Sequence, residues 1–224
     1  MAEATPFVRQ YDTSRDFHNG LHVYQETIDA SLAFEPASTI GSHLWYRPYV
    51  ALTPETCFVL DDGSGRVVGY CLGTAETSSF ARRWRDEFTP TVDPKLVPPR
   101  DLQTGDAIME KDGIKHFRKA VYDAECSMLQ PWPETLQQYP AHLHIDILQE
   151  YQRKGWGTVL IQKFFEVVKS LGASGLHLDM VESNVKARAF YESVGFRICP
   201  QVLDGGESGR TGVNNAVMTL VKDL

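Results

Sequence analysis

Hydrophobic and polar positions are patterned most clearly in the second half of the chain. An apolar strand-like run from His142 to Leu148 is followed by an amphipathic helical pattern from Thr158 to Leu171. A further strand pattern, Gly175 to Val181, leads into a second helical pattern within Asn184 to Phe196. This alternation of strands and helices predicts a sheet that carries helices on its faces.

The first half predicts a strand, a helix and a hairpin. These are strand Phe7–Tyr11, helix Asp16–Ser31, and the hairpin strands Thr56–Asp61 and Val67–Thr74, which Asp62-Gly63-Ser64-Gly65 joins. The alternating segment Ala216–Val221 predicts a last strand, and the glycine-rich polar run Asp204–Asn215 before it predicts a loop. A hairpin followed by strand–helix–strand–helix predicts an α/β fold, in the α+β sense of a mixed sheet.

Residues 76–140 interrupt this order where a short connection between two strands is expected. The segment is rich in proline and in large apolar side chains, and Glu110 to Tyr122 within it predicts a helix. Long insertions in compact domains are usually functional lids or disordered segments. The apolar content favours an ordered segment. We expect this segment to cover the substrate side of a functional site, although a purely structural cover for the sheet fits nearly as well. We therefore expect one domain over residues 1–224.

The segment Gln152-Arg153-Lys154-Gly155-Trp156-Gly157 links the strand His142–Leu148 to the helix that follows. The first N–H groups of a helix lack partners within it, and the helix dipole adds positive charge there, so a glycine-bearing turn at this point predicts a phosphate site. A dinucleotide fingerprint would need glycine at Leu160, and no Walker loop fits. A turn that uses two glycines only for tight geometry remains an alternative.

The spacing Gln-x-x-Gly-x-Gly resembles the pyrophosphate loop of the GNAT acetyltransferases. A second segment, from Asn184 to Phe196, resembles that family's other signature: Ala187 follows Asn184 by three residues, Tyr191 follows by four more, and a Gly-Phe pair closes it. Ala187, Phe190, Tyr191 and Val194 also share one helical stripe, so an ordinary amphipathic helix would explain this segment alone. Both segments in the family's order make coincidence improbable.

The resemblance implies the GNAT acyl-CoA N-acyltransferase fold, with a long insertion before the central CoA-binding strand, and an enzyme that moves the acetyl group of acetyl-CoA to a primary amine. It assigns Tyr191 to the departing thiolate, with a core tyrosine as the alternative. The cofactor-binding residues that it implies are Ile147, Leu148, Gln152, Arg153, Lys154, Gly155, Trp156, Gly157, Thr158, Asn184 and Phe190. The backbone at Ile147 and Leu148 would line the pantetheine arm and supply the oxyanion donor. Gln152 stands where the family frequently has arginine.

His142, His144 and Asp146 are spaced by two along a strand, so they project from one face. We expect Asp146 to orient or deprotonate the amine, with His144 as the second candidate and His142 as a substrate contact. Buried polar residues with satisfied partners, or a solvent-facing stripe, fit about as well. His-x-His-x-Asp also resembles the metal motif of metallo-β-lactamase hydrolases, but Ile147 follows where that motif has histidine. We therefore expect no metal.

The run from Tyr139 to Asp146 is similar to the acetyltransferase-like domains associated with O-GlcNAc hydrolases and to their free-standing microbial relatives. Trp45 to Val50 and Gly69 to Thr74 resemble the same subgroup. Because some fungal members acetylate glucosamine, the resemblance implies an amino sugar, D-glucosamine, as acceptor. We place Glu76 and Trp132 on the substrate side. A protein-lysine acetyltransferase and a non-catalytic acyl-CoA-binding module remain alternatives.

Composition narrows the partners and the compartment. The chain has 224 residues and a net charge of −7, which argues against a general nucleic-acid surface. No apolar run approaches the length of a membrane span, and Met1 to Phe7 shows no signal-peptide pattern. The four cysteines, Cys57, Cys71, Cys126 and Cys199, are dispersed, which is typical of buried thiols in a reducing compartment. We expect a cytoplasmic monomer or homodimer that acts on a small-molecule amine, without nucleic-acid or membrane partners.

Overall fold

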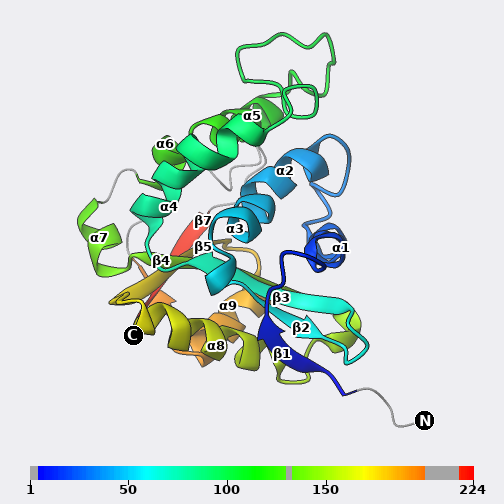
Figure 1. Cartoon of the computed structure of the whole chain (residues 1–224). Helices are drawn as coiled ribbons and strands as arrows, with labels where there is room; N and C mark the ends of the chain where they lie inside the picture. The colour runs from blue at the N-terminus through cyan, green and yellow to red at the C-terminus, as the bar shows by residue number, and fades with distance from the viewer. Residues whose placement is uncertain (1–4, 130–132, 200–216) are drawn as a thin grey trace. The chain divides into compact units, whose positions relative to one another are not determined.

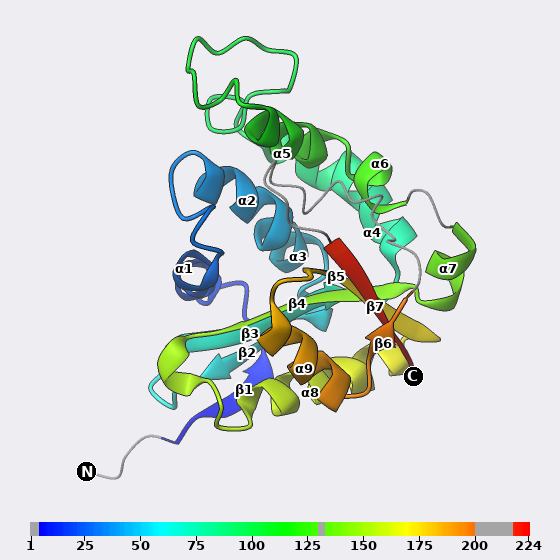
Figure 2. The same cartoon turned by 180° about the vertical axis from the view of Figure 1, so that it is seen from behind.

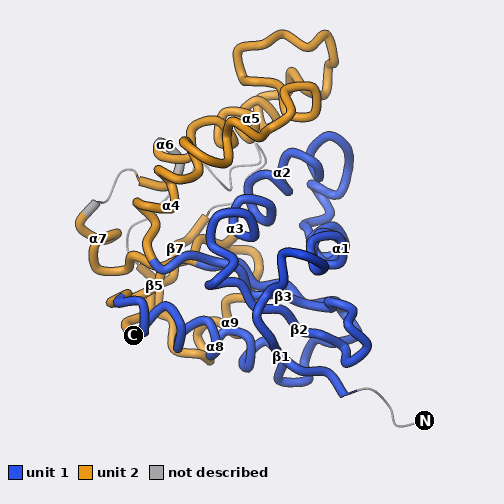
Figure 3. The backbone as a smooth tube through the Cα atoms, in the orientation of Figure 1, with its two compact units in different colours: residues 1–75, 143–172 blue, residues 76–142, 173–224 orange. Residues whose placement is uncertain are grey.

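The structure, a computed structural model, describes residues 5–129, 133–199 and 217–224. The chain divides into two compact units, each built from two separate segments (Figure 3). Unit 1 comprises residues 1–75 and 143–172, and unit 2 comprises residues 76–142 and 173–224. The expectation of a single domain stays a prediction.

The strands of both units follow the order β1-β2-β3-β4-β5-β7-β6. Strand β4, Ala141–Ile147, contributes its first two residues to unit 2 and the rest to unit 1. Strand β4 pairs with β5 in parallel. The other pairs, β1–β2, β2–β3, β5–β7 and β6–β7, are antiparallel. This is the mixed α/β sheet that the sequence predicts.

Unit 1 has helices on both faces of its strands (Figures 1 and 2). Its strands besides β4 are β1 Phe7–Gln10, β2 Phe58–Asp61 and β3 Val67–Thr74. Helices α1 Phe17–Thr27, α2 Ala37–Trp45 and α3 Arg47–Leu52 lie on one face, and α8 Trp156–Ser170 lies on the other. Every residue of β3 is buried, as expected of a strand that is covered on both faces.

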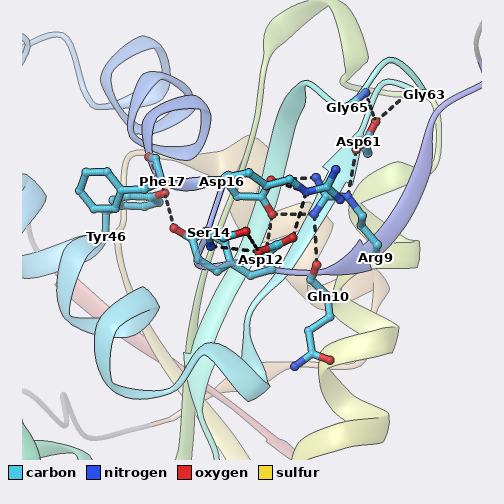
Figure 4. Close-up of polar contacts among 12 residues, drawn as sticks. Arg9, Gln10, Asp12, Ser14, Asp16, Phe17, Tyr46, Asp61, Gly63 and Gly65 are labelled. Atoms are coloured by element: carbon cyan, nitrogen blue, oxygen red, sulfur yellow. Dashed lines mark hydrogen bonds and ion pairs between the residues drawn. The ribbon is translucent and has the colours of Figure 1, made fainter.

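An ion network ties the start of unit 1 to its hairpin (Figure 4). The guanidinium of Arg9 donates two hydrogen bonds to Asp16, at 2.6 and 2.8 Å, and one to Asp61, at 2.9 Å. Asp61 also accepts hydrogen bonds from the backbone N–H groups of Gly63 and Gly65, which shapes the β2–β3 turn. Removing one partner from so buried a set typically costs about 3–5 kcal/mol, because a charge is left without compensation.

Unit 2 contains the segment from 76 to 140 and the C-terminal strands. Its helices are α4 Thr77–Arg83, α5 Asp112–Tyr122, α6 Ala124–Met128, α7 Pro133–Gln138 and α9 Val185–Ser193. Its strands besides β4 are β5 Gly175–Val181, β6 Arg197–Ile198 and β7 Val217–Asp223. Phe80, Trp84 and Phe117 are each 1% exposed, so this segment has a core of its own.

Arg118 organises the polypeptide between α4 and α5. Its buried guanidinium donates hydrogen bonds to five backbone carbonyl groups, those of Pro98, Pro99, Arg100, Leu102 and Met109. One side chain from α5 therefore supplies hydrogen-bond donors to the backbone carbonyl groups of the loop between α4 and α5. The prediction of an ordered segment is confirmed for its described residues.

Most predicted elements are confirmed within a few residues, including β5 at its predicted bounds. The helix predicted from Asp16 to Ser31 ends at Thr27, because Asp29 turns the chain by accepting hydrogen bonds from the N–H and hydroxyl of Ser31. Helices α2 and α3 and the short strand β6 were not predicted. The loop predicted from Asp204 to Asn215 lies outside the described residues.

Candidate active site

The glycine-bearing turn after β4 has the backbone geometry of an anion site. Arg153 and Gly155 both adopt the left-handed conformation, with φ of 58° and 87°. Gly155 forms the N-cap of α8, which has no hydrogen-bonded side chain as a cap, and Trp156 and Gly157 are the first helical residues. The amide groups of this first turn can therefore bind an external anion, with the helix dipole behind them.

Helix α8 is held in place by its apolar face. Its buried residues are Leu160, Ile161, Phe164, Phe165 and Val168, and they recur at the spacing of an amphipathic helix. Arg153, Lys154 and Thr158 are exposed, whereas Trp156 is half-buried. The helix is thus fixed by packing while the polar side chains at its N-terminus remain accessible.

The turn is also fixed to the end of β4. The side-chain nitrogen of Gln152 donates a hydrogen bond to the Ile147 carbonyl at 2.7 Å. The next amide, that of Leu148, donates to the Val68 carbonyl at 2.9 Å. The peptide between Ile147 and Leu148 is therefore bound at both ends. The Leu148 N–H is thus engaged by β3. The oxyanion role of the backbone at Ile147 and Leu148 stays a prediction.

Gly69 allows the close approach of β3 to this part of β4. A Cβ atom on Gly69 would lie 2.9 Å from a side-chain carbon of Ile147 and 3.1 Å from the Asp146 carbonyl oxygen. Such contacts are too short for any residue other than glycine without movement of the strand. Gly69 thus sets the spacing between β3 and β4 beside Asp146.

Asp146 is half-buried on β4 and is bound by a tyrosine from β3. The Tyr70 hydroxyl donates a hydrogen bond to Oδ2 of Asp146 at 2.7 Å, and Tyr70 itself is 1% exposed. Burial raises the pKa of Asp146, and hydrogen bonds from Tyr70 and Thr27 partly oppose this shift. A carboxylate whose pKa lies above its usual value is a better proton acceptor near neutral pH.

His144 lies two residues earlier on the same strand. Its Nε2 lies 3.1 Å from the Tyr49 hydroxyl, and the two rings meet edge to face. Burial lowers the pKa of His144 to about 4, so its imidazole is neutral at pH 7. A neutral histidine with so low a pKa is a weak base, which favours Asp146 for proton transfer.

In unit 2, His142 has the partners of a structural residue. Its Nδ1 lies 2.7 Å from the Thr77 hydroxyl, and its ring packs against Phe80 and His177. His142 is 8% exposed. These contacts agree with the alternative of a buried, satisfied polar residue more closely than with a substrate contact.

Of the other two predicted substrate residues, Glu76 and Trp132, only Glu76 lies within the described residues. Glu76 is the N-cap of α4: its carboxylate accepts hydrogen bonds from the backbone N–H groups of Ser78 and Ser79, at 2.9 and 2.6 Å. Burial would raise the pKa of Glu76, but these hydrogen bonds lower it overall. Its position is thus explained by helix capping. Trp132 lies outside the described residues.

The second signature forms α9 in unit 2. Asn184 is its N-cap and accepts a hydrogen bond from the Ala187 N–H at 3.1 Å, which is a structural role beside the predicted cofactor contact. Gly195 ends the segment with φ of 96°, as its position predicts. Tyr191 packs edge to face on Phe196 and beside Phe190. Within α9 none of the described residues is fully buried, so Tyr191 is half-exposed rather than a core residue.

Residues 5–129, 133–199 and 217–224 contain no cluster of three or more His, Cys, Asp or Glu that could hold a metal ion. Within the same ranges, none of the helices has the length and apolar character needed to cross a membrane. Cys57, Cys71 and Cys199 are buried free thiols.

Sequence reasoning missed Tyr70 and Tyr49, which bind Asp146 and His144. Both lie in segments that carry the subgroup resemblance, but tyrosine in an apolar strand or helix is usually a packing residue. The signal that could have found Tyr70 is its place beside Gly69, since a glycine in a strand often marks close backbone approach.

The sequence model of the Acetyltransferase (GNAT) family matches residues 110–196, which include the turn and α9. Among solved structures, that of SsHAT is similar to this chain, with 28% identity, a TM-score of 0.79 and coverage of 98% of both chains.

Two more distant structures share the fold. That of an agmatine N-acetyltransferase has 17% identity and a TM-score of 0.58, with 98% of this chain and 99% of the other covered. That of the NatC complex bound to Gag peptide and CoA has 12% identity and a TM-score of 0.53, with 98% of both chains covered.

Proposed function

Because this chain is a GNAT-family N-acetyltransferase, we propose that it transfers the acetyl group of acetyl-CoA to the primary amine of a small molecule, an amino sugar of the D-glucosamine type. The observation that carries the small-amine acceptor is the half-buried Asp146 on β4, with Tyr70 on one of its oxygens. A carboxylate in such a place can bind one ammonium group.

The surroundings of Asp146 suit a polar, hydroxylated acceptor. The hydroxyl groups of Tyr70 and Thr27 act on the carboxylate, and burial, followed by the negative charge of Asp146, raises the pKa of Tyr24. Tyr24 and Tyr70 are 3% and 1% exposed, so their rings support Asp146 from its buried side.

For the cofactor, we propose that the turn from Gln152 to Gly157 and Thr158 binds the pyrophosphate of acetyl-CoA. The left-handed residues Arg153 and Gly155 and the uncapped start of α8 support this assignment. Arg153 and Lys154 add positive charge beside the turn. Asn184 and Phe190 stay proposed cofactor contacts on the resemblance alone.

The proposed reaction proceeds by direct attack in a ternary complex. Asp146 takes one proton from the ammonium group, and the neutral nitrogen attacks the thioester carbonyl carbon. The tetrahedral intermediate collapses as the C–S bond breaks, and the nitrogen releases its second proton. Tyr191 is proposed to protonate the thiolate and to regain its proton from solvent. The products are the acetamide, CoA thiol and one released proton.

A panel assay tests this proposal. Free CoA thiol is followed with acetyl-CoA and D-glucosamine, agmatine, a polyamine, an arylamine and a lysine peptide as acceptors. We expect kcat/KM for glucosamine to exceed that for the lysine peptide by at least about tenfold, a difference of about 1.4 kcal/mol. Faster turnover of the peptide would overturn the small-molecule assignment and favour a protein-lysine acetyltransferase.

A further inference from the structure

Asp146 has two carboxylate oxygens, and only one of them is occupied by a hydroxyl from β3. Tyr70 donates to Oδ2 at 2.7 Å. Because Tyr70 is almost fully buried, its hydroxyl has no bulk water as an alternative partner. Its pKa lies well above the usual value, owing first to burial and then to the charge of Asp146, so the hydroxyl stays protonated and always donates. Oδ2 of the ionised Asp146 therefore keeps accepting the hydrogen bond from Tyr70.

The tyrosine is itself held in place by its neighbours. Its ring packs against Tyr46 with centroids 5.7 Å apart, and the Tyr46 hydroxyl donates to the Phe17 carbonyl at 2.9 Å. Gly20 leaves room for this hydroxyl, because a Cβ there would lie 2.2 Å from it. On the backbone side, Gly69 and Val68 bring β3 against β4. Tyr70 is thus fixed through both its ring and its main chain.

On this basis, and resting on the proposed function, we propose that Tyr70 is a positioning residue that assigns the two oxygens of Asp146 different tasks. It holds Oδ2 and turns Oδ1 toward the acceptor amine, so that Oδ1 alone takes the proton. The step itself is unchanged: one N–H bond breaks, one O–H bond forms on Oδ1, and the freed electron pair on nitrogen attacks the carbonyl carbon.

The groups around Asp146 make this arrangement sensitive to one hydrogen bond. The groups that act on Asp146 or feel its charge include Tyr70 and Cys71 from β3 and Tyr24 and Thr27 from α1. All four are uncharged at neutral pH, since burial raises the pKa of the tyrosines and of the thiol. The hydroxyl of Tyr70 is therefore the principal influence that opposes burial.

The variant Tyr70→Phe removes this hydroxyl and almost no volume. We expect the pKa of Asp146 to rise by about one pH unit, because a hydrogen bond to the charged form is lost while burial remains. The acid limb of the kcat/KM profile should move to higher pH by the same amount, with activity partly recovered at high pH. A purely structural defect would lower activity equally at every pH.

The matched control is Tyr46→Phe, which keeps the ring that packs on Tyr70 and removes a hydroxyl that does not touch Asp146. It should leave both the pKa of Asp146 and the acid limb unchanged. The pKa of Asp146 is measured directly by NMR titration of ¹³C-labelled aspartate carboxyl groups, with the resonance assigned by its loss in Asp146→Asn. This measurement needs no substrate, so it stands apart from the panel assay.

A second measurement uses the unaltered protein, in case the variant does not fold. The Tyr70 ¹³Cζ resonance should titrate with the same midpoint as the Asp146 carboxyl group, because the two share a hydrogen bond. The inference would be overturned if the Asp146 carboxyl group titrated with the same midpoint in wild type and in Tyr70→Phe. It would also be overturned if the Tyr70 ¹³Cζ chemical shift did not change as Asp146 titrates. A shifted midpoint without turnover of any amine would establish the effect of Tyr70 on the Asp146 carboxyl group, but it would refute the proposed function and with it the task assigned to Oδ1.

Discussion

The side-chain nitrogen of Gln152 donates a 2.7 Å hydrogen bond to the carbonyl of Ile147, five residues earlier in the chain. The sequence had suggested that Gln152 binds phosphate, at a position where arginine would bring charge. Its amide nitrogen closes the turn onto the end of β4, and the phosphate contact stays a prediction. Gln152 therefore couples the turn that begins α8 to the strand that carries Asp146.

The two glycines of this turn should respond differently to substitution. Gly157→Val places a branched side chain at the second residue of α8, where we propose that backbone meets pyrophosphate. Acetyl-CoA affinity should fall about tenfold or more, which corresponds to at least about 1.4 kcal/mol. Isothermal titration calorimetry with acetyl-CoA measures this.

Gly155→Ala is the matched control. Its Cβ would meet nothing within 4 Å, but a φ of 87° is unfavourable for alanine, so the cost should appear mainly as about 1 kcal/mol of stability. Unchanged affinity in a folded Gly157→Val protein would refute the pyrophosphate assignment.

The role of Asp146 can be tested through its kinetic constants. Asp146→Asn keeps the shape and removes the charge and the proton acceptor. If Asp146 is the general base, glucosamine turnover should slow by about 10²–10⁴-fold. If Asp146 only orients the amine, KM should rise while kcat changes little. Steady-state kinetics against pH separate these outcomes. Should neither constant change, Asp146 lies outside the reaction and His144 becomes the residue to test.

Several of these features could be read from the sequence, and others could not. The turn, α8 and the cap at Gly195 follow from glycine placement and helical periodicity, which are local properties. Tyr70 and Tyr49 were missed because their function depends on partners 76 and 95 residues away in the chain. Helix α2 was not predicted because buried polar residues such as Ser42 and His43 break the apolar stripe on which recognition of a helix depends.

Tyr191→Phe distinguishes a catalytic tyrosine from a packing one. The hydroxyl is removed, but the ring contacts with Phe190 and Phe196 remain. If Tyr191 protonates the thiolate, kcat should fall while calorimetric affinity for acetyl-CoA is retained, since the interaction matters only in the transition state. Phe196→Leu alters the packing without touching the hydroxyl and serves as control. Equal turnover of Tyr191→Phe and wild type would return Tyr191 to a packing role.

The buried His177 and the half-buried His144 should make the protein less stable in weak acid. His177 is 6% exposed, and its Nδ1 lies 2.7 Å from the Tyr139 carbonyl oxygen. Burial lowers its pKa to about 4, although the hydrogen bond to Tyr139 opposes the shift, and burial lowers the pKa of His144 to about 4 as well. Both therefore stay neutral in the folded state, whereas in the unfolded chain they gain a proton near pH 6.5.

The sign of the pH dependence follows from this difference in bound protons. Above pH 6.5 neither state is protonated at these sites, so they contribute no slope. As the pH falls from 6.5 toward 4, the unfolded state binds more protons, and the free energy of unfolding should decrease by up to about 1.4 kcal/mol per pH unit for each histidine. The total for His177 is on the order of 3–4 kcal/mol, the equivalent of its whole pKa shift.

Urea unfolding at several pH values between 4 and 8 measures this slope. His177→Gln keeps a hydrogen-bonding side chain but cannot titrate, so its slope between pH 6.5 and 4 should be shallower than that of the wild type by about one proton. His22→Gln, at an exposed position of α1, is the matched control for a histidine substitution. Carboxylates with lowered pKa values, such as Asp61, lose their contribution only at still lower pH, which keeps the two effects separate. A His177→Gln slope identical to that of the wild type would show that His177 takes up its proton without unfolding.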